Sequence, residues 1–132
     1  MDQPVGVGFG DLDDTNFPVN DYYENAETFI IFIKKFLEIY PEFSGSDLYI
    51  TGESFAGHFI PPIAEKVFEF VEKFSSSNYK PILNFKGISI GNGWIDPISH
   101  YLSYPEFAWR NKLITNSKKL LAYPATYLCI SM

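Results

Sequence analysis

The chain has 132 residues and a mass of 15.1 kDa, which is enough for one domain with one hydrophobic core. Hydrophobic residues make up 46% and charged residues 20%, so the composition is globular and argues against intrinsic disorder and a coiled coil. The net charge of -6 argues against a protein that binds nucleic-acid phosphates. No apolar run approaches the roughly 18 residues of a membrane-spanning helix. The single cysteine, Cys129, excludes an internal disulfide framework and a cysteine-rich zinc site.

The first residues carry neither the charged segment nor the apolar segment of a signal peptide. Met1 leads directly into D-Q-P-V-G-V-G-F-G at residues 2–10. Residues 6–21 are rich in Gly, Asp, Asn and Pro, which predicts an irregular loop. A parallel sheet needs a strand before the first helix, so we expect residues 1–4 to be the end of a strand whose body is missing.

The first helix is expected to begin near Asp21, which together with Glu24 has the spacing of a capping box. The apolar residues that follow lie at offsets of 1, 4, 7, 8 and 11, the pattern of one face of a helix: Phe29, Ile30, Ile33, Phe36, Leu37 and Tyr40. Pro41 cannot continue the helical hydrogen bonds and is expected to end this helix.

Two short β-prone runs flank a second helical pattern. Residues 48–51 predict a buried strand, and residues 85–90 predict another. Between them, residues 54–74 have helical periodicity. Pro61 and Pro62 interrupt this pattern and predict a kink or a restart of the helix.

Beyond Pro97 the pattern is weaker and favours helices near residues 104–110 and 117–122. The order of helix, strand, helix and strand, with short connections, is typical of a parallel sheet in an α/β protein.

The strongest chemical pattern is G-E-S-F-A-G at residues 52–57, between the first strand and the following helix. It fits G-x-S-x-x-G rather than the strict G-x-S-x-G of a nucleophile elbow, since Ala56 stands where the second glycine usually falls. Small neighbours let strand and helix approach closely around a serine in strained backbone. Ser54 is therefore a candidate nucleophile, and the backbone N–H of Phe55 is a candidate oxyanion donor. The alternative is that Ser54 merely caps the helix after a tight turn.

Three stretches of sequence occur in an order and approximate spacing known from one enzyme family. The segment I-T-G-E-S-F-A-G-H-F-I-P at residues 50–61 resembles that family's nucleophile segment, with Phe55 where Tyr is usual. D-Q-P-V-G-V-G-F at residues 2–9 is similar to its D-Q-P-x-G-x-G-F stretch. G-N-G-W-I-D-P at residues 91–97 resembles its G-N-G segment after the next strand. On these motifs the chain resembles the serine carboxypeptidases.

The resemblance implies a three-layer α/β-hydrolase fold and the removal of C-terminal residues from peptides by acyl transfer through a serine. By position, Ser54 would be the nucleophile and the N–H of Phe55 one oxyanion donor. Glu53 would belong to a carboxyl pair or network that binds the substrate's C-terminal carboxylate. A carboxylic acid beside a carboxylate must hold a proton, so this binding should weaken as the pH rises. Without the resemblance, Glu53 would be a solvated carboxylate favoured by the helix dipole. No metal or cofactor is implied.

A complete catalytic triad is not expected within the chain. α/β-Hydrolases place the acid and the base after the nucleophile, in the order Ser, Asp, His. His58 lies one helical turn beyond Ser54 and is expected to pack or form a hydrogen bond in the interior. His100 follows the second strand and is expected to lie at the surface or line a pocket. The resemblance implies an acid and a base farther C-terminal, and an upstream W-N-G-G-P-G stretch that supplies the other oxyanion donor. Gly10 and Asp11 stand where the family usually has Ser-Tyr, an aromatic wall of the substrate pocket.

We therefore expect residues 1–132 to form a single partial α/β-hydrolase domain, matched to the family over about residues 2–110, with a divergent tail at residues 111–132. The predicted function is that of a truncated serine carboxypeptidase with little activity alone, because a serine without its base leaves little hydrolysis. One alternative is an esterase or acyltransferase on the same scaffold. Another is a non-catalytic pseudoenzyme that acts through binding, and a third is an incomplete gene model.

The expected partner is the C-terminus of a peptide or protein substrate. Neither nucleic acid nor a membrane span is expected, and the oligomeric state is left open. The resemblance implies a location in the vacuole, in the lysosome or outside the cell, reached by the secretory route.

Overall fold

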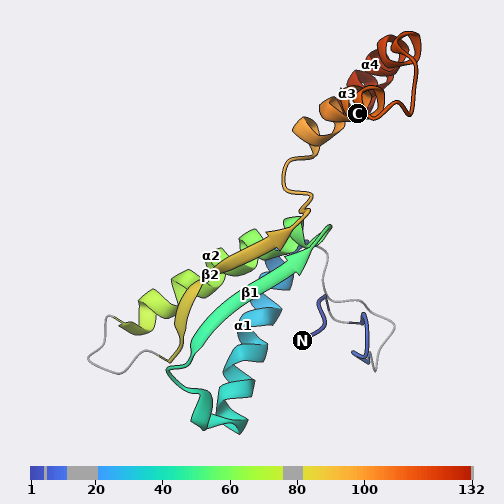
Figure 1. Ribbon diagram of the computed structural model, residues 1–132. Coiled ribbons are helices and arrows are strands. Elements are labelled where there is room, and N and C mark those ends of the chain that lie inside the picture. Colours follow the sequence, from blue (N-terminus) through green and yellow to red (C-terminus); the bar gives the residue numbers. More distant parts are fainter. Residues whose placement is uncertain (5, 12–20, 76–81, 132) are drawn as a thin grey trace. The chain divides into compact units, whose positions relative to one another are not determined.

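The computed structural model describes residues 1–4, 6–11, 21–75 and 82–131. The chain divides into two compact units, residues 1–93 and residues 94–132 (Figure 1). Among the described residues, the first unit holds two α-helices, a short 3-10 helix and two strands, and the second holds two further α-helices. Within the described ranges, no helix combines the length and the apolar character needed to cross a membrane. The expectation of a single domain over the whole chain stays a prediction.

Helix α1 (Tyr22–Ile39) begins as the capping pattern predicts. The Asp21 Oδ1 atom accepts hydrogen bonds from the backbone nitrogens of Tyr23 and Glu24, at 2.7 and 2.8 Å. The first N–H groups of a helix have no partner inside it, so these two bonds satisfy donors that the helix itself cannot. The start of the helix is therefore fixed by one side chain.

Pro41 ends α1 as expected and opens the short 3-10 helix η1 (Pro41–Phe43).

The predicted parallel pair of strands is confirmed. Strand β1 (Asp47–Glu53) then pairs in parallel with strand β2 (Asn84–Gly91). The last pair in the register is Glu53 opposite Gly91, so the carboxyl ends of the two strands lie side by side at one edge of the sheet.

Helix α2 (Ala56–Ser75) connects the strands and contains Pro61 and Pro62 without interruption. The predicted restart of the helix is therefore wrong. A proline inside a helix costs about 3 kcal/mol. Ile60 and Ile63, next to the prolines, are each only 3% exposed, and burial of such a side chain stabilises by about 1.5–3 kcal/mol. Core packing of the neighbours thus offsets the lost backbone bonds.

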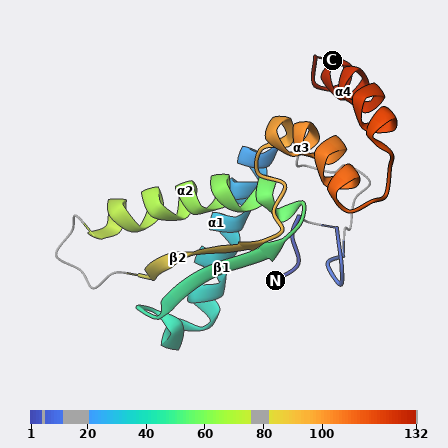
Figure 2. The same cartoon turned by 45° about the horizontal axis from the view of Figure 1, so that its top comes forward.

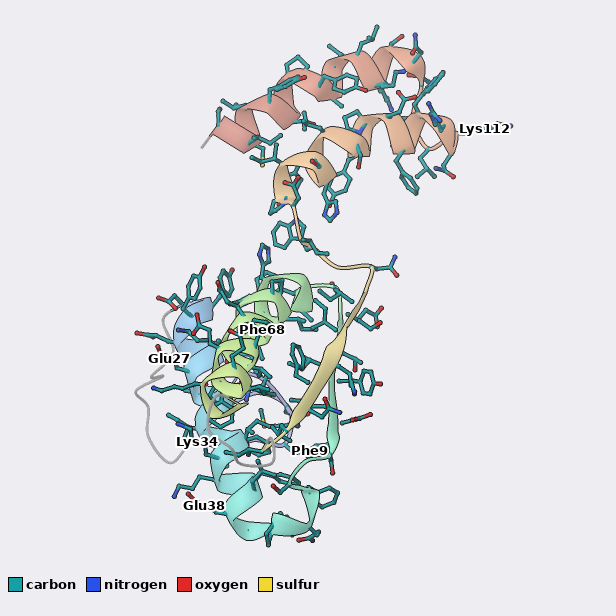
Figure 3. The ribbon with its side chains drawn as sticks, turned by 90° about the vertical axis from the view of Figure 1, so that its left-hand side faces the viewer. Phe9, Glu27, Lys34, Glu38, Phe68 and Lys112 are labelled. Carbon is teal, nitrogen blue, oxygen red and sulfur yellow. The ribbon has the colours of Figure 1, made fainter. Side chains whose placement is uncertain are left out.

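Helices α1 and α2 lie on the same side of the sheet (Figures 2 and 3). Buried apolar residues of α1, β1 and α2 form the core between them: Ala26, Ile50, Ile60, Ile63 and Val67. On the opposite face Tyr49 is 64% exposed, since alternate residues of a strand point to opposite sides. The sequence predicts that the strand at residues 48–51 is buried. This is wrong for the face of the sheet that carries Tyr49, because the described helices of this unit cover only the opposite face.

The end of β1 approaches the first turns of α2 very closely. A Cβ atom at Gly52 would lie 2.6 Å from the Cβ atom of Ala56 and 2.8 Å from Cδ1 of Ile60. Both distances are shorter than carbon atoms tolerate without displacement. Glycine at position 52 and a small residue at position 56 thus allow the close approach that the sequence pattern predicts.

Both predicted helices of the second unit are present and longer than expected: α3 (Pro97–Arg110) and α4 (Asn116–Ser131). Lys119 of α4 joins them. Its Nζ atom lies 3.1 Å from the Glu106 carboxylate and 3.8 Å from the centroid of the Trp109 ring. One cation on α4 therefore binds both a carboxylate and an aromatic face of α3.

Helix α3 has a capped start. Asp96 Oδ1 accepts hydrogen bonds from the backbone N–H groups of Ile98 and Ser99, and Oδ2 accepts one from the Ser99 hydroxyl. These bonds, led by the one from the Ser99 hydroxyl, favour the carboxylate and hold the pKa of Asp96 below its ordinary value of 3.8.

Gly52→Ala is expected to lower the free energy of unfolding by about 1–3 kcal/mol, because the new methyl group overpacks the contact between β1 and α2. Gly91→Ala is the matched control, since a Cβ atom there meets nothing closer than 3.9 Å. Adding Ala56→Gly to the Gly52→Ala variant should recover part of the loss, because it removes the nearer clash. Equal unfolding midpoints in urea for Gly52→Ala and Gly91→Ala would contradict this packing.

The capping hydrogen bonds of Asp96 predict how the stability of α3 depends on pH. Because the pKa of Asp96 is lower in the folded state, its contribution to stability is present above the ordinary value and is lost as the pH falls through the folded pKa. An NMR titration should therefore give a pKa for Asp96 below 3.8. Asp96→Asn keeps a capping side chain but does not titrate, so it should remove this part of the acid sensitivity of α3. An Asp96 pKa at or above the ordinary value would contradict the cap.

Candidate active site

A sharp turn at Ser54 and Phe55 joins β1 to α2. The strand ends at Glu53 and the helix begins at Ala56, so two residues connect them. Ser54 has a φ of 58°, in the left-handed region that residues with a Cβ atom rarely occupy. Its side chain is exposed. The chain thus contains a strained strand-to-helix turn with an accessible serine at its tip.

Backbone hydrogen bonds hold this turn from both sides. The Ser54 N–H donates to the Gly91 carbonyl at the end of β2, with 2.9 Å between nitrogen and oxygen. On the helix side, the Gly57 N–H donates to the Ser54 carbonyl at 3.1 Å, and the His58 N–H donates to the Phe55 carbonyl at 3.0 Å. The left-handed residue is therefore fixed between the end of the sheet and the first turn of α2.

Four rings gather around the start of α2, those of Tyr22, Phe55, His58 and Phe59. The Tyr22 and His58 rings stack with 5.3 Å between their centroids and 9° between their planes. The Phe55 ring lies 4.9 Å from the His58 ring. His58 thus packs among aromatic side chains and is half-buried. Phe55 remains 43% exposed and presents an apolar ring to solvent next to Ser54.

Glu53 is the last residue of β1 and is exposed. It lies opposite Gly91 in the sheet register. Glu53, Ser54 and Phe55 are consecutive at the carboxyl edge of the parallel strands, where α/β sheets bind their ligands. The structure therefore places all three predicted site residues at one edge, while the role of each stays a prediction.

Asp96 and His100 belong to the second unit. The Asp96 carboxylate caps α3, and the backbone N–H of His100 donates to the Asp96 carbonyl at 3.1 Å in the first helical turn. His100 is half-buried. Within this unit the carboxylate of Asp96 acts as the N-cap of α3.

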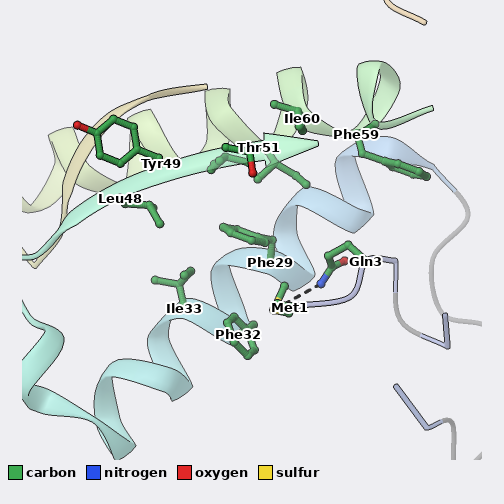
Figure 4. Close-up of a pocket in the computed structure, with 13 residues that line it drawn as sticks. Met1, Gln3, Phe29, Phe32, Ile33, Leu48, Tyr49, Thr51, Phe59 and Ile60 are labelled. Atoms are coloured by element: carbon green, nitrogen blue, oxygen red, sulfur yellow. Dashed lines mark hydrogen bonds between the residues drawn. The ribbon is translucent and has the colours of Figure 1, made fainter. Parts of the chain in front are cut away.

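A largely apolar cavity of about 420 Å³ lies between α1, α2 and β1 (Figure 4). Its lining includes Met1, Gln3, Phe29, Leu48, Phe59 and Ile60. Glu53, Ser54 and Phe55 do not line it. This cavity is therefore a gap beside the core and not the place where the predicted site residues meet.

Asn92 lies at the same edge, and sequence reasoning gave it no role of its own, although the G-N-G segment at residues 91–93 carries part of the resemblance. Asn92 directly follows β2 and has a φ of 47°, again in the left-handed region. The signal that could have found it is an asparagine between two glycines at the end of a strand, since asparagine tolerates this conformation better than most residues.

Comparisons with known proteins identify the family of the chain. The protein-family model for serine carboxypeptidases matches residues 1–123. The pheromone-processing carboxypeptidase KEX1 of Coccidioides posadasii is 39% identical over 114 residues, which are 86% of this chain and 18% of that protein. The corresponding protein of Neosartorya fischeri is 41% identical over 120 residues, 91% of this chain and 19% of that protein.

The fold is also similar to a solved structure. Kex1(Δ)p, a prohormone-processing carboxypeptidase from Saccharomyces cerevisiae, superposes with a TM-score of 0.78 and 32% sequence identity. The superposition covers 98% of this chain and 29% of that one. The chain spans about a fifth of the length of the curated relatives that it matches. With its elbow, its parallel strands and these matches, the chain belongs to the serine carboxypeptidase family and has part of an α/β-hydrolase fold.

Proposed function

We propose that this chain supplies the nucleophile segment of a serine carboxypeptidase, with Ser54 as the attacking residue. The observation that carries the proposal is an exposed serine in a left-handed turn between β1 and α2, in a chain of this family. The Ser54 hydroxyl oxygen forms a bond to the carbonyl carbon of the substrate's last peptide bond, and its proton passes to a general base. The C–N bond then breaks, the leaving amine takes up the proton, and water hydrolyses the acyl-enzyme.

The backbone N–H of Phe55 is proposed as one donor to the oxyanion. The carbonyl oxygen gains negative charge as the serine attacks, so a donor that is already in position stabilises the transition state. Phe55 directly precedes α2, whose N-terminal end is favourable for an anion. The hydrogen bond from the His58 N–H to the Phe55 carbonyl fixes the adjacent peptide group.

Glu53 is proposed to recognise the substrate's C-terminal carboxylate. Two carboxyl groups bind each other only if they share a proton, so the Glu53 side chain would act as a hydrogen-bond donor. Its place as the neighbour of Ser54 supports this role, because an exopeptidase must hold the chain end close to the bond that it cleaves.

The general base and the orienting acid are proposed to lie in the remainder of a longer protein, since this chain spans about a fifth of its curated relatives. The relatives' names describe the processing of pheromones and prohormones. We therefore propose the C-termini of peptides or proteins as substrates. Location in the vacuole, in the lysosome or outside the cell remains a prediction.

A hybrid carboxypeptidase tests the nucleophile. In it, the matching segment of the Saccharomyces cerevisiae relative is replaced by residues 2–110 of this chain. The hybrid is expected to release C-terminal residues from blocked dipeptides, and Ser54→Ala should lower kcat by about 10⁶-fold. Ser44→Ala, at another exposed serine, should leave kcat unchanged. A hybrid that melts cooperatively but has no activity, or that keeps its activity in Ser54→Ala, would contradict the proposal.

The same hybrid tests Glu53 and separates a carboxypeptidase from an esterase. Binding through a shared proton should weaken as the pH rises, so KM should rise with pH for blocked dipeptides with a free C-terminal carboxylate. Glu53→Gln should reduce this rise, because a glutamine side chain does not titrate. It should leave KM for the corresponding dipeptide esters nearly unchanged, because these have no terminal carboxylate to bind. Equal effects on both substrates would exclude Glu53 from carboxylate recognition.

A further inference from the structure

Two residues with left-handed backbone lie at the carboxyl edge of the sheet. Ser54 follows β1 with a φ of 58°, and Asn92 follows β2 with a φ of 47°. Neither is a glycine, so each adopts a conformation that a Cβ atom disfavours. Such strain persists only where the surrounding structure enforces it, and it is found most often at functional sites.

One hydrogen bond connects the two strained turns. The Ser54 N–H donates to the carbonyl of Gly91, and Gly91 is the residue directly before Asn92. The carbonyl of Gly91 and the nitrogen of Asn92 belong to the same peptide group, so the backbone turn at Asn92 begins at the group that binds Ser54. A change of conformation at Asn92 therefore acts on the acceptor of the Ser54 N–H.

A third residue, Lys112, also has left-handed backbone, and the end of a helix explains its conformation. Lys112 has a φ of 58° and follows α3. Its N–H donates to the Trp109 carbonyl at 2.9 Å, and the Leu113 N–H donates to the Ala108 carbonyl at 2.9 Å. This pair of bonds is the usual left-handed end of a helix. Asn92 ends no helix, and its side chain is exposed.

We propose that Asn92 is a positioning residue for Ser54: its left-handed turn holds the Gly91 carbonyl against the Ser54 N–H and so fixes the elbow. The residue acts through the backbone and does not touch the substrate. The catalytic importance of this role rests on the proposed function of Ser54, but the coupling between the two turns does not.

The first test is amide hydrogen exchange, measured by NMR on the full 132-residue chain. Asn92→Val places a β-branched residue in the left-handed region and should speed exchange at the Ser54 amide by about 5- to 30-fold. Amides in the middle of the strands, such as those of Ile50 and Ile88, should change less than twofold. Asn92→Gly accepts the left-handed conformation and should keep Ser54 exchange within about threefold of the original chain. Unchanged exchange at Ser54 in Asn92→Val, or equal acceleration at all three amides, would overturn the proposal.

The second test uses the kinetics of the hybrid carboxypeptidase. Asn92→Val should lower kcat by about 5- to 30-fold with little change in KM, and Asn92→Gly should restore it. An active hybrid whose kcat is the same in Asn92→Val would overturn the positioning role. An inactive hybrid would overturn the proposed function of Ser54, while the exchange measurement would still decide whether Asn92 holds the elbow.

Discussion

The contact between the end of β1 and the first turns of α2 determines how the sheet of the first unit joins its second helix. Gly52 comes so close to Ala56 and Ile60 that a methyl group there would displace its neighbours. This contact puts the end of the strand against the start of the helix and leaves two residues for the connection. So short a connection accounts for the left-handed conformation of Ser54, and this serine is exposed at the tip of the turn.

The strain at Ser54 is contained by its neighbours. The Gly91 carbonyl holds its N–H, and the Gly57 N–H holds its carbonyl. Both peptide groups of the serine are therefore held by hydrogen bonds within the chain, which supports the proposed nucleophile role, because preorganised groups stabilise a transition state. The aromatic side chains at the start of α2 pack against one another beside this turn and leave Phe55 partly exposed next to the serine.

Features set by local sequence could be predicted. The start of α1 depends on one capping side chain, Asp21, and its end on Pro41. The close approach of β1 and α2 could be predicted because only small residues fit there, and the sequence has Gly52 and Ala56 at the required spacing. The position of Glu53, Ser54 and Phe55 at the sheet edge followed from the strand-to-helix order alone.

Features set by tertiary packing could not be predicted in the same way. Pro61 and Pro62 predicted a kink or a restart of the helix, and the restart is absent because the burial of Ile60 and Ile63 offsets the lost bonds; burial is not visible in a local pattern. The exposure of Tyr49 depends on which face of the sheet the helices cover. Sequence reasoning had no ground to assign Asn92 a role, because the bond from the Ser54 N–H to the Gly91 carbonyl joins the ends of two strands that are far apart in sequence.

We propose that Ser54 is an activated nucleophile in its complete protein context. The most direct measurement is mass spectrometry of the hybrid carboxypeptidase after reaction with a fluorophosphonate, which forms a covalent bond only with an activated serine. We expect one adduct per active molecule, on the peptide that contains Ser54, with loss of activity in proportion to labelling. An adduct on a different serine, or a fully active hybrid that remains unmodified at Ser54, would contradict it.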